Sequence, residues 1–453
     1  MQYQQSKDHQ RTAYHFQPPS HWMNDPNGLV QWKGNYHLFY QHNPYGPLNG
    51  KMHWGHAMSP DLLHWTHLPI ALTPTEGGPD EDGCWSGCLV NNHGTPTLIY
   101  SGNAHGHQLP CLATSTDDLL TWHKYSGNPV IPSWPPDLEI VEFRDHCVWQ
   151  EGDQWYQIIG SGIQGVGGTV LLYRSPDLIN WEYLQPLYIG NKNESGTMWE
   201  CPDFFPLGDK YVLIISSGPV HYFIGSYQNF TFTPEHLGVL DRSAHFYAPQ
   251  SMRDEQGRRV LFGWLREDRD TTALQAAGWA GVMSLPRILS LQSDGTLSIE
   301  PAAELTHLRH HHRQVAPQLI EGNLIVTEQL SSNALEIILD VEYSLSSHCG
   351  LCIQDRSYPD ESLQINLQAT GLSVEQTGGN QPSSEHCSLE PGRHTLHIFL
   401  DGSVMEIFID NQACLTERFY HSVPQQLSLS VFSNEGEARL HQLDVWELAS
   451  VWG

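Results

Sequence analysis

A weak internal repeat is the feature of this sequence that most restricts how the chain can fold. Residues 59–65 (SPDLLHW) recur as residues 115–122 with one residue inserted, and again as residues 175–181. The tryptophans that end these three copies are 57 and then 59 residues apart. A more degenerate copy begins at Ser226. A chain with such a period is built from similar units that follow one another.

The period predicts a β-propeller. One propeller blade contains four short strands and their turns, which a repeat of this length can supply. Short apolar segments that read as strands lie between the copies, at residues 36–41, 97–100, 170–173 and 211–216. About 300 residues at roughly 58 per repeat predict about five blades. The alternative is three unrelated turns that coincide by chance, and the matched Ser, Asp, Leu and Trp argue against it.

The pattern changes near Pro301. Residues 302–309 predict a short helix, and the three histidines at 310–312 read as an exposed linker rather than as a metal site. From residue 319 the apolar residues alternate as in regular strands, and an Asp-Gly pair at residue 401 marks a tight hairpin. Several short strands at this spacing predict a β-sandwich.

We therefore expect an all-β chain in three parts. These are a five-bladed propeller over residues 1–300, a linker with a short helix over 301–318, and a C-terminal β-sandwich over 319–453. Glycine (39), proline (29) and tryptophan (15) are plentiful and long helical patterns are few, which agrees with this fold class. Nothing in the sandwich half converges on chemistry.

The charge of the chain excludes several classes of partner. It carries 50 acidic and 22 basic residues, a net charge of −28. Such a chain is poorly suited to nucleic acid or to anionic membrane surfaces. No stretch is long and apolar enough to cross a bilayer, and residues 1–11 lack the apolar run of a signal peptide. We expect a cytoplasmic protein.

The cysteines predict neither a disulfide framework nor a metal centre. There are nine, an odd number, at irregular spacing. Cys349 and Cys352 form a C-x-x-C pair, but no second pair at zinc spacing accompanies them. We expect reduced, structural thiols. The sequence carries no signal for an oligomeric state.

Three acidic residues stand out in the propeller half. Asp25 lies in HWMNDPNG, Asp145 in EFRDH and Glu200 in MWECPDFF. Taken singly, each is typical of a structural ion pair. Because 120 and then 55 residues separate them, they belong to different blades. The same end of each blade's inner strand faces the central funnel of a propeller, so the three side chains are expected to meet there.

A group of carboxyls in one funnel suits glycoside cleavage. One carboxyl must be protonated to assist the leaving oxygen, and another must be ionised to attack or stabilise the anomeric carbon. Apolar neighbours such as Trp199 favour a neutral Glu200. The amides beside Asp25 favour its anion, and Arg144 should keep Asp145 ionised.

The three motifs resemble, in order and spacing, those of glycoside hydrolase family 32, the β-fructofuranosidases. The resemblance covers essentially the whole chain and implies a five-bladed propeller followed by a β-sandwich. It implies that Asp25 is the nucleophile, that Glu200 is the general acid/base, and that Asp145 holds hydroxyls of the fructosyl ring. The family retains configuration, which predicts that the carboxyls of Asp25 and Glu200 lie about 5 to 5.5 Å apart. No metal or organic cofactor is required.

Further positions match the family's substrate-binding residues. Those expected to contact the sugar are Asn24, Gln41, Trp54, Trp85, Ser86, Arg144, Tyr247 and Trp279. An aromatic residue among them can serve as a stacking wall or as part of the propeller core. For Trp54 and Tyr247 both interpretations stay open.

The chain departs from the family pattern at two positions. His146 follows the Arg-Asp pair where proline is usual, from which we expect altered loop stiffness with activity kept. Asn49 stands where many extracellular invertases and inulinases carry tryptophan. Residues 44–51 are instead similar to the bacterial intracellular sucrose and sucrose-6-phosphate hydrolases, which points to a short substrate.

The leading hypothesis is a retaining β-fructofuranosidase that acts on the small sugar sucrose. Sucrose 6-phosphate, short fructans and fructosyl transfer are alternatives within the family, with Lys51 as a candidate phosphate contact. A non-catalytic sugar-binding propeller is the alternative from another class. A propeller scaffold for protein partners would leave the three acidic motifs unexplained.

Overall fold

The computed structural model describes most of the chain, namely residues 8–356, 358, 360–377, 384–420 and 427–452. These residues are mainly β-strand. They divide into two compact units. The first unit consists of Gln17–Leu240 and Phe246–Leu297. The second consists of residues 8–16, Asp241–His245 and residues 298–452. Among the described residues, no helix has the length and apolar composition that a membrane span requires.

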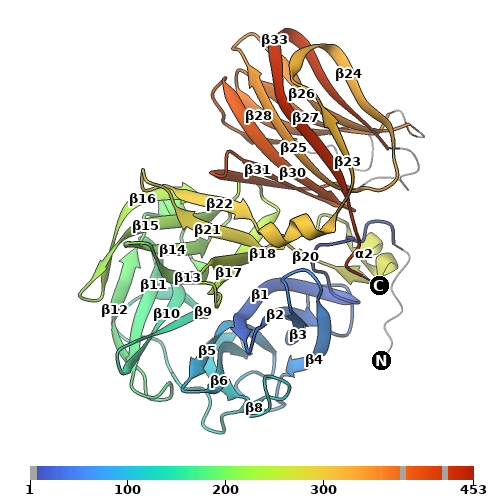
Figure 1. Cartoon of the computed structure of the whole chain (residues 1–453). Coiled ribbons are helices and arrows are strands. Elements are labelled where there is room, and N and C mark those ends of the chain that lie inside the picture. Colours follow the sequence, from blue (N-terminus) through green and yellow to red (C-terminus); the bar gives the residue numbers. More distant parts are fainter. Residues whose placement is uncertain (1–7, 357, 359, 378–383, 421–426, 453) are drawn as a thin grey trace. The chain divides into compact units, whose positions relative to one another are not determined.

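The first unit is a five-bladed β-propeller, as predicted. Figure 1 shows its sheets, coloured blue to yellow, arranged around a common axis. The first three blades are the antiparallel sheets β1 (His21–Trp32), β2 (Asn35–Asn43), β3 (His53–Ser59), β4 (Thr66–Leu72); β5 (Gly83–Asn92), β6 (Thr95–Ala104), β7 (His107–Thr114), β8 (His123–Lys124); and β9 (Ile140–Glu151), β10 (Gln154–Ile163), β11 (Gly167–Ser175), β12 (Glu182–Ile189).

Two further sheets complete the unit, with two short helices between strands. They are β13 (Glu200–Leu207), β14 (Lys210–Ser216), β15 (Val220–Gln228), β16 (Thr231–Val239); and β17 (Phe246–Arg253), β18 (Arg259–Leu265), β20 (Val282–Met283), β21 (Arg287–Leu291), β22 (Leu297–Pro301). The helices are α1 (Lys192–Ser195) and α2 (Thr271–Ala277).

The propeller is closed by contacts between first strands and by one late strand. β1, β5, β9, β13 and β17 each contact the next in this order, and β17 contacts β1. β19 (Trp279–Ala280) then adds to the first sheet by pairing in parallel with β1, with His21 opposite Trp279. The first blade therefore contains strands from both ends of the propeller sequence.

The repeated motif is the turn between the third and fourth strands of a blade. In the third copy, the Asp177 carboxylate accepts the backbone N–H groups of Ile179 (3.0 Å) and Asn180 (2.8 Å). The Trp181 indole N–H donates to the carbonyl of Leu178 (2.9 Å). Aspartate closes such turns because its side chain satisfies backbone donors that would otherwise lack a partner. The repeat in the sequence is thus a repeated turn, in which an aspartate accepts backbone N–H groups and a tryptophan donates to a backbone carbonyl.

The other copies confirm this interpretation. Asp61 accepts the same two backbone donors, from Leu63 and His64. In the copy with an inserted residue, Asp117 accepts from Thr121, one position later. The degenerate copy after Ser226 lies at the equivalent turn between β15 and β16.

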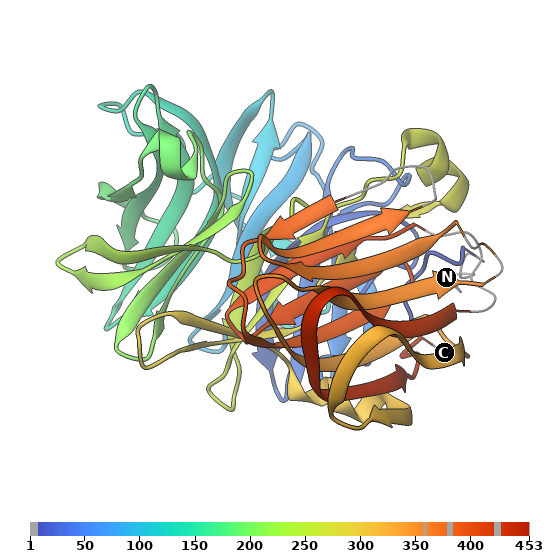
Figure 2. The ribbon, with the colours of Figure 1, turned by 90° about the horizontal axis from the view of Figure 1, so that it is seen from above.

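The second unit is a β-sandwich, also as predicted, and Figure 2 shows several of its strands, in orange to red, running side by side. Its elements are the 3-10 helix η1 (Ala303–Leu308), β23 (Arg309–Val315), β24 (Gln318–Leu330), β25 (Ala334–Tyr343), β26 (His348–Asp355), β27 (Ser362–Gln368), β28 (Gly371–Thr377), β29 (Ser384–Cys387), β30 (Arg393–Asp401), β31 (Val404–Ile409), β32 (Ala413–Arg418) and β33 (Leu427–Leu448).

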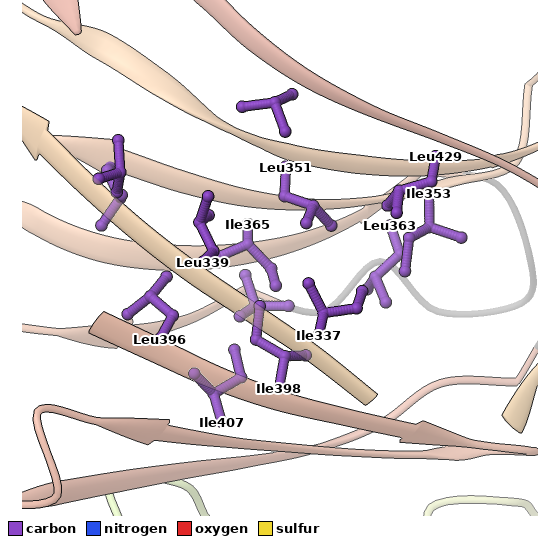
Figure 3. Packing of buried hydrophobic residues seen from close by; sticks show 14 of the residues in the cluster. Ile337, Leu339, Leu351, Ile353, Leu363, Ile365, Leu396, Ile398, Ile407 and Leu429 are labelled. Atoms are coloured by element: carbon purple, nitrogen blue, oxygen red, sulfur yellow. The ribbon is translucent and has the colours of Figure 1, made fainter. Parts of the chain in front are cut away.

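One long strand connects the two layers of the sandwich. The first half of β33 pairs with β26, and its second half pairs with β25. The strand turns at Gly436, where φ is +66° and a Cβ atom would lie 2.6 Å from the carbonyl oxygen of Ser346, so only glycine fits. Aliphatic side chains from both layers fill the space between them, as Figure 3 shows for Ile337 and Ile398 beside Leu351 and Ile365.

The expected linker over 301–318 is a folded part of the sandwich unit. It contains η1 and then β23, whose Arg309 and Val315 lie opposite Leu448 and Leu443 of β33. A bulge between His310 and Arg313 interrupts the pairing, and this hides the strand alternation in the sequence. The three histidines are exposed, as expected for this segment.

The chain's first described residues belong to the sandwich unit through a buried ion-pair network. The backbone N–H groups of Tyr14 and His15 each donate to Asp401 at 2.8 Å. The His15 ring lies between two carboxylates, with Nδ1 2.8 Å from Asp401 and Nε2 3.0 Å from Glu406. Burial lowers the pKa of His15, but the hydrogen bonds to Asp401 and Glu406 outweigh it, and the pKa is raised.

This network predicts a pH-dependent stability. Because the folded pKa of His15 is raised, its stabilisation is complete below the ordinary histidine pKa of about 6.5 and is lost as the pH rises through the folded value. We expect His15→Gln to lower the free energy of unfolding at pH 6 and to lower it less at pH 9. Denaturant unfolding followed by circular dichroism measures this difference. The control is His64→Gln, which removes an exposed histidine paired with Asp61; equal losses at both pH values would contradict the prediction.

Candidate active site

The inner strand of every blade carries a bulge at the same level. In each case the pairing with the second strand skips one or two residues. The skipped residues are Asp25 in β1, Ser86 in β5, Asp145 in β9, Cys201 and Pro202 in β13, and Ala248 and Pro249 in β17. A bulge bends a strand and redirects its side chains. Five bulges around one axis therefore gather residues from all five blades, and the motifs found in the sequence coincide with them.

A cavity of 270 Å³ lies at this level. It is lined by Asn24, Asp25, Gln41, Asn49, Gly50, Met52, Trp85, Ser86, Arg144, Asp145, Glu200 and Trp264. The three acidic residues singled out in the sequence thus share one cavity with five of the residues expected to contact the sugar. All of the lining residues belong to the propeller unit.

Asp25 is held by hydrogen bonds at the base of this cavity. Its Oδ2 accepts the hydroxyl of Ser86 at 2.7 Å. Burial raises the pKa of Asp25, and hydrogen bonds from Ser86 and Asn24 lower it by less, while the charge of Glu200 raises it further. The amide of Asn24 favours the anion, as expected, but desolvation, which the expectation left out, outweighs it.

Asp145 is the most buried of the three carboxyls. It is 5% exposed, and its Oδ2 accepts the backbone N–H of Cys201 at 2.9 Å. Burial raises the pKa of Asp145 to about 7, against the lowering by Arg144 and with the help of Glu200 and Asp25. We expected Arg144 to keep this group ionised. Arg144 instead directs its guanidinium to Glu142 (2.7 Å) and Glu200 (2.8 Å).

Glu200 is more open than the sequence indicated. Its side chain is 33% exposed, and it accepts hydrogen bonds from Arg144 and from the hydroxyl of Tyr247. Trp199, by contrast, is fully buried among Tyr188 and Phe223. Successive residues of a strand point to opposite faces, so the apolar neighbour that we expected to desolvate Glu200 packs on the other side.

The thiol of Cys201 joins two of the carboxyls. Its Sγ lies 3.6 Å from Oδ2 of Asp25 and 3.5 Å from Oδ2 of Asp145. It can donate its one proton to either. Cys201 has a left-handed backbone, φ +46°, which the bulge in β13 imposes. No motif indicated this contact, since it depends on the bulge.

His146 supports the bulge of β9. Its Nε2 lies 3.1 Å from the hydroxyl oxygen of Ser101, which also accepts the backbone N–H of Asp145 at 2.9 Å. Ser101 in turn donates to the carbonyl of Ser86. Burial lowers the pKa of His146 to about 3, so the ring is neutral. The residue that replaces the family's usual proline thus holds the serine that fixes Asp145.

The expected aromatic contacts divide into two groups. Trp85 lines the cavity, and Tyr247 reaches it through its bond to Glu200. The structure does not bring Trp54 and Trp279 to the cavity: both are fully buried and neither lines it. The indole of Trp54 packs against Phe39 and Tyr100 and donates to the carbonyl of Trp85, so it acts as core.

Sequence reasoning missed three lining residues, Gly50, Met52 and Trp264. Gly50 and Met52 lie just before β3, and Trp264 lies near the end of β18, with its ring 5.9 Å from that of Trp22. None of the three belongs to a motif that predicts a catalytic or sugar-binding role. Only the position of Trp264 at the funnel end of a second strand, opposite Tyr247 in the pairing, could have indicated it.

One group of described residues has the spacing of metal ligands, namely Glu81, Asp82 and His105. None of the three lines the cavity, and two are exposed. Exposed acidic clusters of this kind are common without an ion. The charged groups that line the cavity itself are three carboxyls and one arginine.

The raised pKa of Asp145 predicts that Asp145→Asn stabilises the protein at pH 8. An acid whose folded pKa lies above its unfolded value costs stability as the pH rises from one to the other, here from 3.8 to about 7. At about 1.4 kcal/mol per pKa unit, the gain is at most roughly 4 kcal/mol. Asparagine also tolerates the left-handed backbone at this position, φ +62°.

Thermal unfolding of Asp145→Asn at pH 4 and pH 8 measures this gain. We expect a higher melting temperature at pH 8 and little change at pH 4. Asp117→Asn is the control, because hydrogen bonds lower the pKa of Asp117 and the same substitution should not stabilise there. No gain at pH 8 would show that Asp145 is ionised without cost.

Comparison with known proteins identifies the family. Residues 15–301 match the model of the glycosyl hydrolases family 32 N-terminal domain, and residues 304–447 match that of the family 32 C terminal. The sucrose-6-phosphate hydrolase of Escherichia coli is 34% identical, over 96% of this chain and 94% of that protein.

Solved structures agree over the same length. Fructan 1-exohydrolase IIa from Cichorium intybus matches with a TM-score of 0.87 and 26% identity, over 98% of both chains. The β-fructofuranosidase of Bombyx mori matches with a TM-score of 0.81 and 29% identity, over 98% of this chain and 95% of that one. The bulged inner strands, the shared cavity of carboxyls and these matches lead to one conclusion: the chain is a glycoside hydrolase and belongs to family 32.

Proposed function

We propose that this protein is a retaining β-fructofuranosidase that releases fructose from sucrose. The observation that carries the proposal is the single cavity in which Asp25 and Glu200 both lie, with Glu200 held by Arg144 and Tyr247. Homologous enzymes have been captured with such substrates: the Bombyx mori enzyme with sucrose and the Cichorium intybus enzyme with 1-kestose. Short fructo-oligosaccharides are therefore further substrates to test.

In the proposed reaction, Glu200 protonates the glycosidic oxygen as glucose leaves, and Asp25 attacks the anomeric carbon of the fructosyl group. Water that Glu200 deprotonates then releases fructose from Asp25. Asp145 accepts hydroxyls of the fructosyl ring. This route requires carboxyls of Asp25 and Glu200 about 5 to 5.5 Å apart.

The charges of the carboxyls act on the two aspartates. The charge of Glu200 raises the pKa of both Asp25 and Asp145, and the charge of Asp25 raises that of Asp145. Because the charge of Asp25 favours a proton on Asp145, a proton on Asp145 in turn favours an ionised Asp25, which the proposed attack requires.

Removal of either catalytic carboxyl tests the proposal. We expect Asp25→Ala to abolish fructose release from sucrose, and Glu200→Gln to lower its rate about 100-fold or more, as for loss of a general acid/base. Initial rates with sucrose, 1-kestose and inulin measure this. Glu142→Gln is the matched control, because Glu142 also binds Arg144 but does not line the cavity.

The same assay separates the catalytic reading from a non-catalytic one. If the unaltered protein binds sucrose or fructose but turns over none of the three sugars, a sugar-binding propeller is the better account. If Glu200→Gln keeps full activity, the assignment of the general acid/base is wrong.

A second candidate substrate is sucrose phosphorylated on the glucose, because the rim of the cavity holds cations with unused donors. The guanidinium of Arg266 stacks 3.7 Å from the ring centre of Tyr247 and 5.7 Å from that of Trp264. Within the described part of the chain, no side-chain hydrogen bond or ion pair engages it. Lys51, exposed, lies between the lining residues Gly50 and Met52.

Such groups suit a phosphate despite the acidity of the whole chain. Stacking on aromatic rings orders a guanidinium while its N–H groups stay available to an oxyanion. The Escherichia coli relative is a sucrose-6-phosphate hydrolase by name. Local cations rather than net charge decide what a cavity rim binds.

Arg266→Gln discriminates between the two substrates. A charge-assisted hydrogen bond contributes about 1.5 to 3 kcal/mol, so we expect kcat/KM for sucrose 6-phosphate to fall about tenfold or more and that for sucrose to change little. Initial rates with both sugars measure this. Arg174→Gln, which removes an exposed arginine paired with Glu182, is the control. Equal losses for both sugars would exclude a phosphate contact at Arg266.

We further propose a cytoplasmic location. All nine cysteines are free in the structure, and six of them are buried. A chain that keeps so many thiols unpaired suits a reducing compartment.

A further inference from the structure

A second cavity, of 260 Å³, lies at the other end of the inner strands. The active-site residues occupy the beginnings of β1, β5, β9, β13 and β17, whereas this cavity is lined by later residues of the same strands and by one residue of β18. The lining residues are Leu29, Val30, Cys88, Leu89, Cys147, Val148, Trp149, Asp203, Phe204, Phe205, Pro206, Gln250, Ser251, Met252, Arg253 and Arg259. None of them lines the catalytic cavity.

Side-chain amides join three of the inner strands between the two cavities. Gln250 donates to the carbonyl of Gly87 at 2.9 Å and accepts the backbone N–H of Leu29 at 3.1 Å. Asn27, two residues before Leu29 in β1, accepts the N–H of Gly87 at 3.0 Å. These bonds link β1, β5 and β17, and the two cavities share no lining residue, so the second cavity is a separate site.

Two arginines face each other at this cavity. Arg253 of β17 and Arg259 of β18 are direct partners in the antiparallel pairing. Like charges directly opposite each other across two strands are destabilising. Arg253 is exposed and Arg259 is partly buried, so solvent screens the second charge less than the first. Two cations lie together here although the chain has more than twice as many acidic as basic residues.

The donors of Arg259 are largely unused. Its guanidinium stacks 4.1 Å from the ring centre of Phe205, and its single hydrogen bond to a side chain is a long one of 3.5 Å to the hydroxyl of Ser251. Among the described residues no carboxylate forms an ion pair with it. A guanidinium has five N–H donors in a planar fork that matches an oxyanion.

Asp203, the acidic group of the cavity, is already engaged. Its Oδ2 accepts both the backbone N–H (2.9 Å) and the hydroxyl of Ser251, and the Cys147 thiol lies 3.7 Å from its Oδ1. Burial raises the pKa of Asp203, against the lowering by Arg259. The nearby Arg258 and Asp254 pair with each other. With two arginines and one aspartate, the lining carries a net positive charge.

We propose that this cavity binds a small oxyanion that carries an apolar group, with the oxyanion held by Arg259 and Arg253. The apolar group lies against the aliphatic and aromatic walls formed by Val30, Val148, Phe205 and Met252. The bound anion neutralises the cross-strand arginine pair and so stabilises the fifth blade. A carboxylate and a phosphate ester share this chemistry. The inference is independent of the proposed substrate.

Calorimetric titration of the full chain with sodium benzoate and with inorganic phosphate, at constant ionic strength, tests the proposal. We expect benzoate to bind and Arg259→Gln to weaken its binding about tenfold or more, the effect of losing charge-assisted hydrogen bonds. Arg266→Gln, at the rim of the catalytic cavity, should leave the affinity unchanged. Binding that depends on Arg266 and not on Arg259 would place the anion in the catalytic cavity and overturn the proposal.

The two probes also separate the parts of the ligand. Tighter binding of benzoate than of phosphate supports an apolar carboxylate. Binding of phosphate alone, lost in Arg259→Gln, would keep the oxyanion site but overturn the role of the apolar walls. Binding of neither probe would overturn the proposal as a whole.

A second variant tests the same site independently of whether Arg259→Gln folds. Arg253→Gln changes an exposed residue, and because it removes a like-charge contact we expect its melting temperature without anion to match or exceed that of the unaltered protein. Benzoate should raise the melting temperature of the unaltered protein and raise that of Arg253→Gln less. Equal shifts in both proteins would indicate a general salt effect and contradict a site at the arginine pair.

Discussion

The five bulges of the inner strands are the constraint on which the rest of the propeller's chemistry depends. Each one takes a residue out of the strand ladder, and its backbone N–H must then find another acceptor. Serines on second strands supply it: Ser101 accepts from Asp145 at 2.9 Å, and Ser216 accepts from Ala248 at 3.2 Å. One blade therefore fixes the catalytic end of the next. A bulge at the same level of every inner strand places the lining residues of the cavity, and the serine hydrogen bonds hold two of these bulges in position.

Hydrogen bonds hold three acidic side chains in one cavity. Asp145 is buried and Asp25 is half-buried, both near the thiol of Cys201, and Glu200 is bound by the one arginine of the cavity. Desolvation and the charges of neighbouring acids both raise the pKa of Asp25 and Asp145. The cavity is lined by three acids and a single arginine, so its charge is not balanced by cations. A sugar hydroxyl that donates to Asp145, as proposed, would favour the ionised form of that carboxyl.

Much of this arrangement could be predicted from the sequence, and the failures have a common cause. The turn motif at Asp61, Asp117 and Asp177 is local chemistry, so it revealed the blades and their number. The acidic motifs coincide with bulges, so they revealed the cavity. Burial is not local: Trp54 belongs to the core, and Asp145 is more desolvated than the adjacent Arg144 indicates. The strand after Ala303–Leu308 was hidden by its own bulge.

The pairing of β19 with β1 has a consequence for synthesis on the ribosome. The strand that carries Asp25 is among the first parts of the chain to emerge, yet its second partner strand, Trp279–Ala280, follows about 250 residues later. The partners of His15, which are Asp401 and Glu406, are synthesised later still. In the nascent chain, one edge of β1 therefore lacks its partner strand while the other four blades form. For much of the chain's synthesis, the segment most exposed to pairing with other chains is thus the one that carries Asp25.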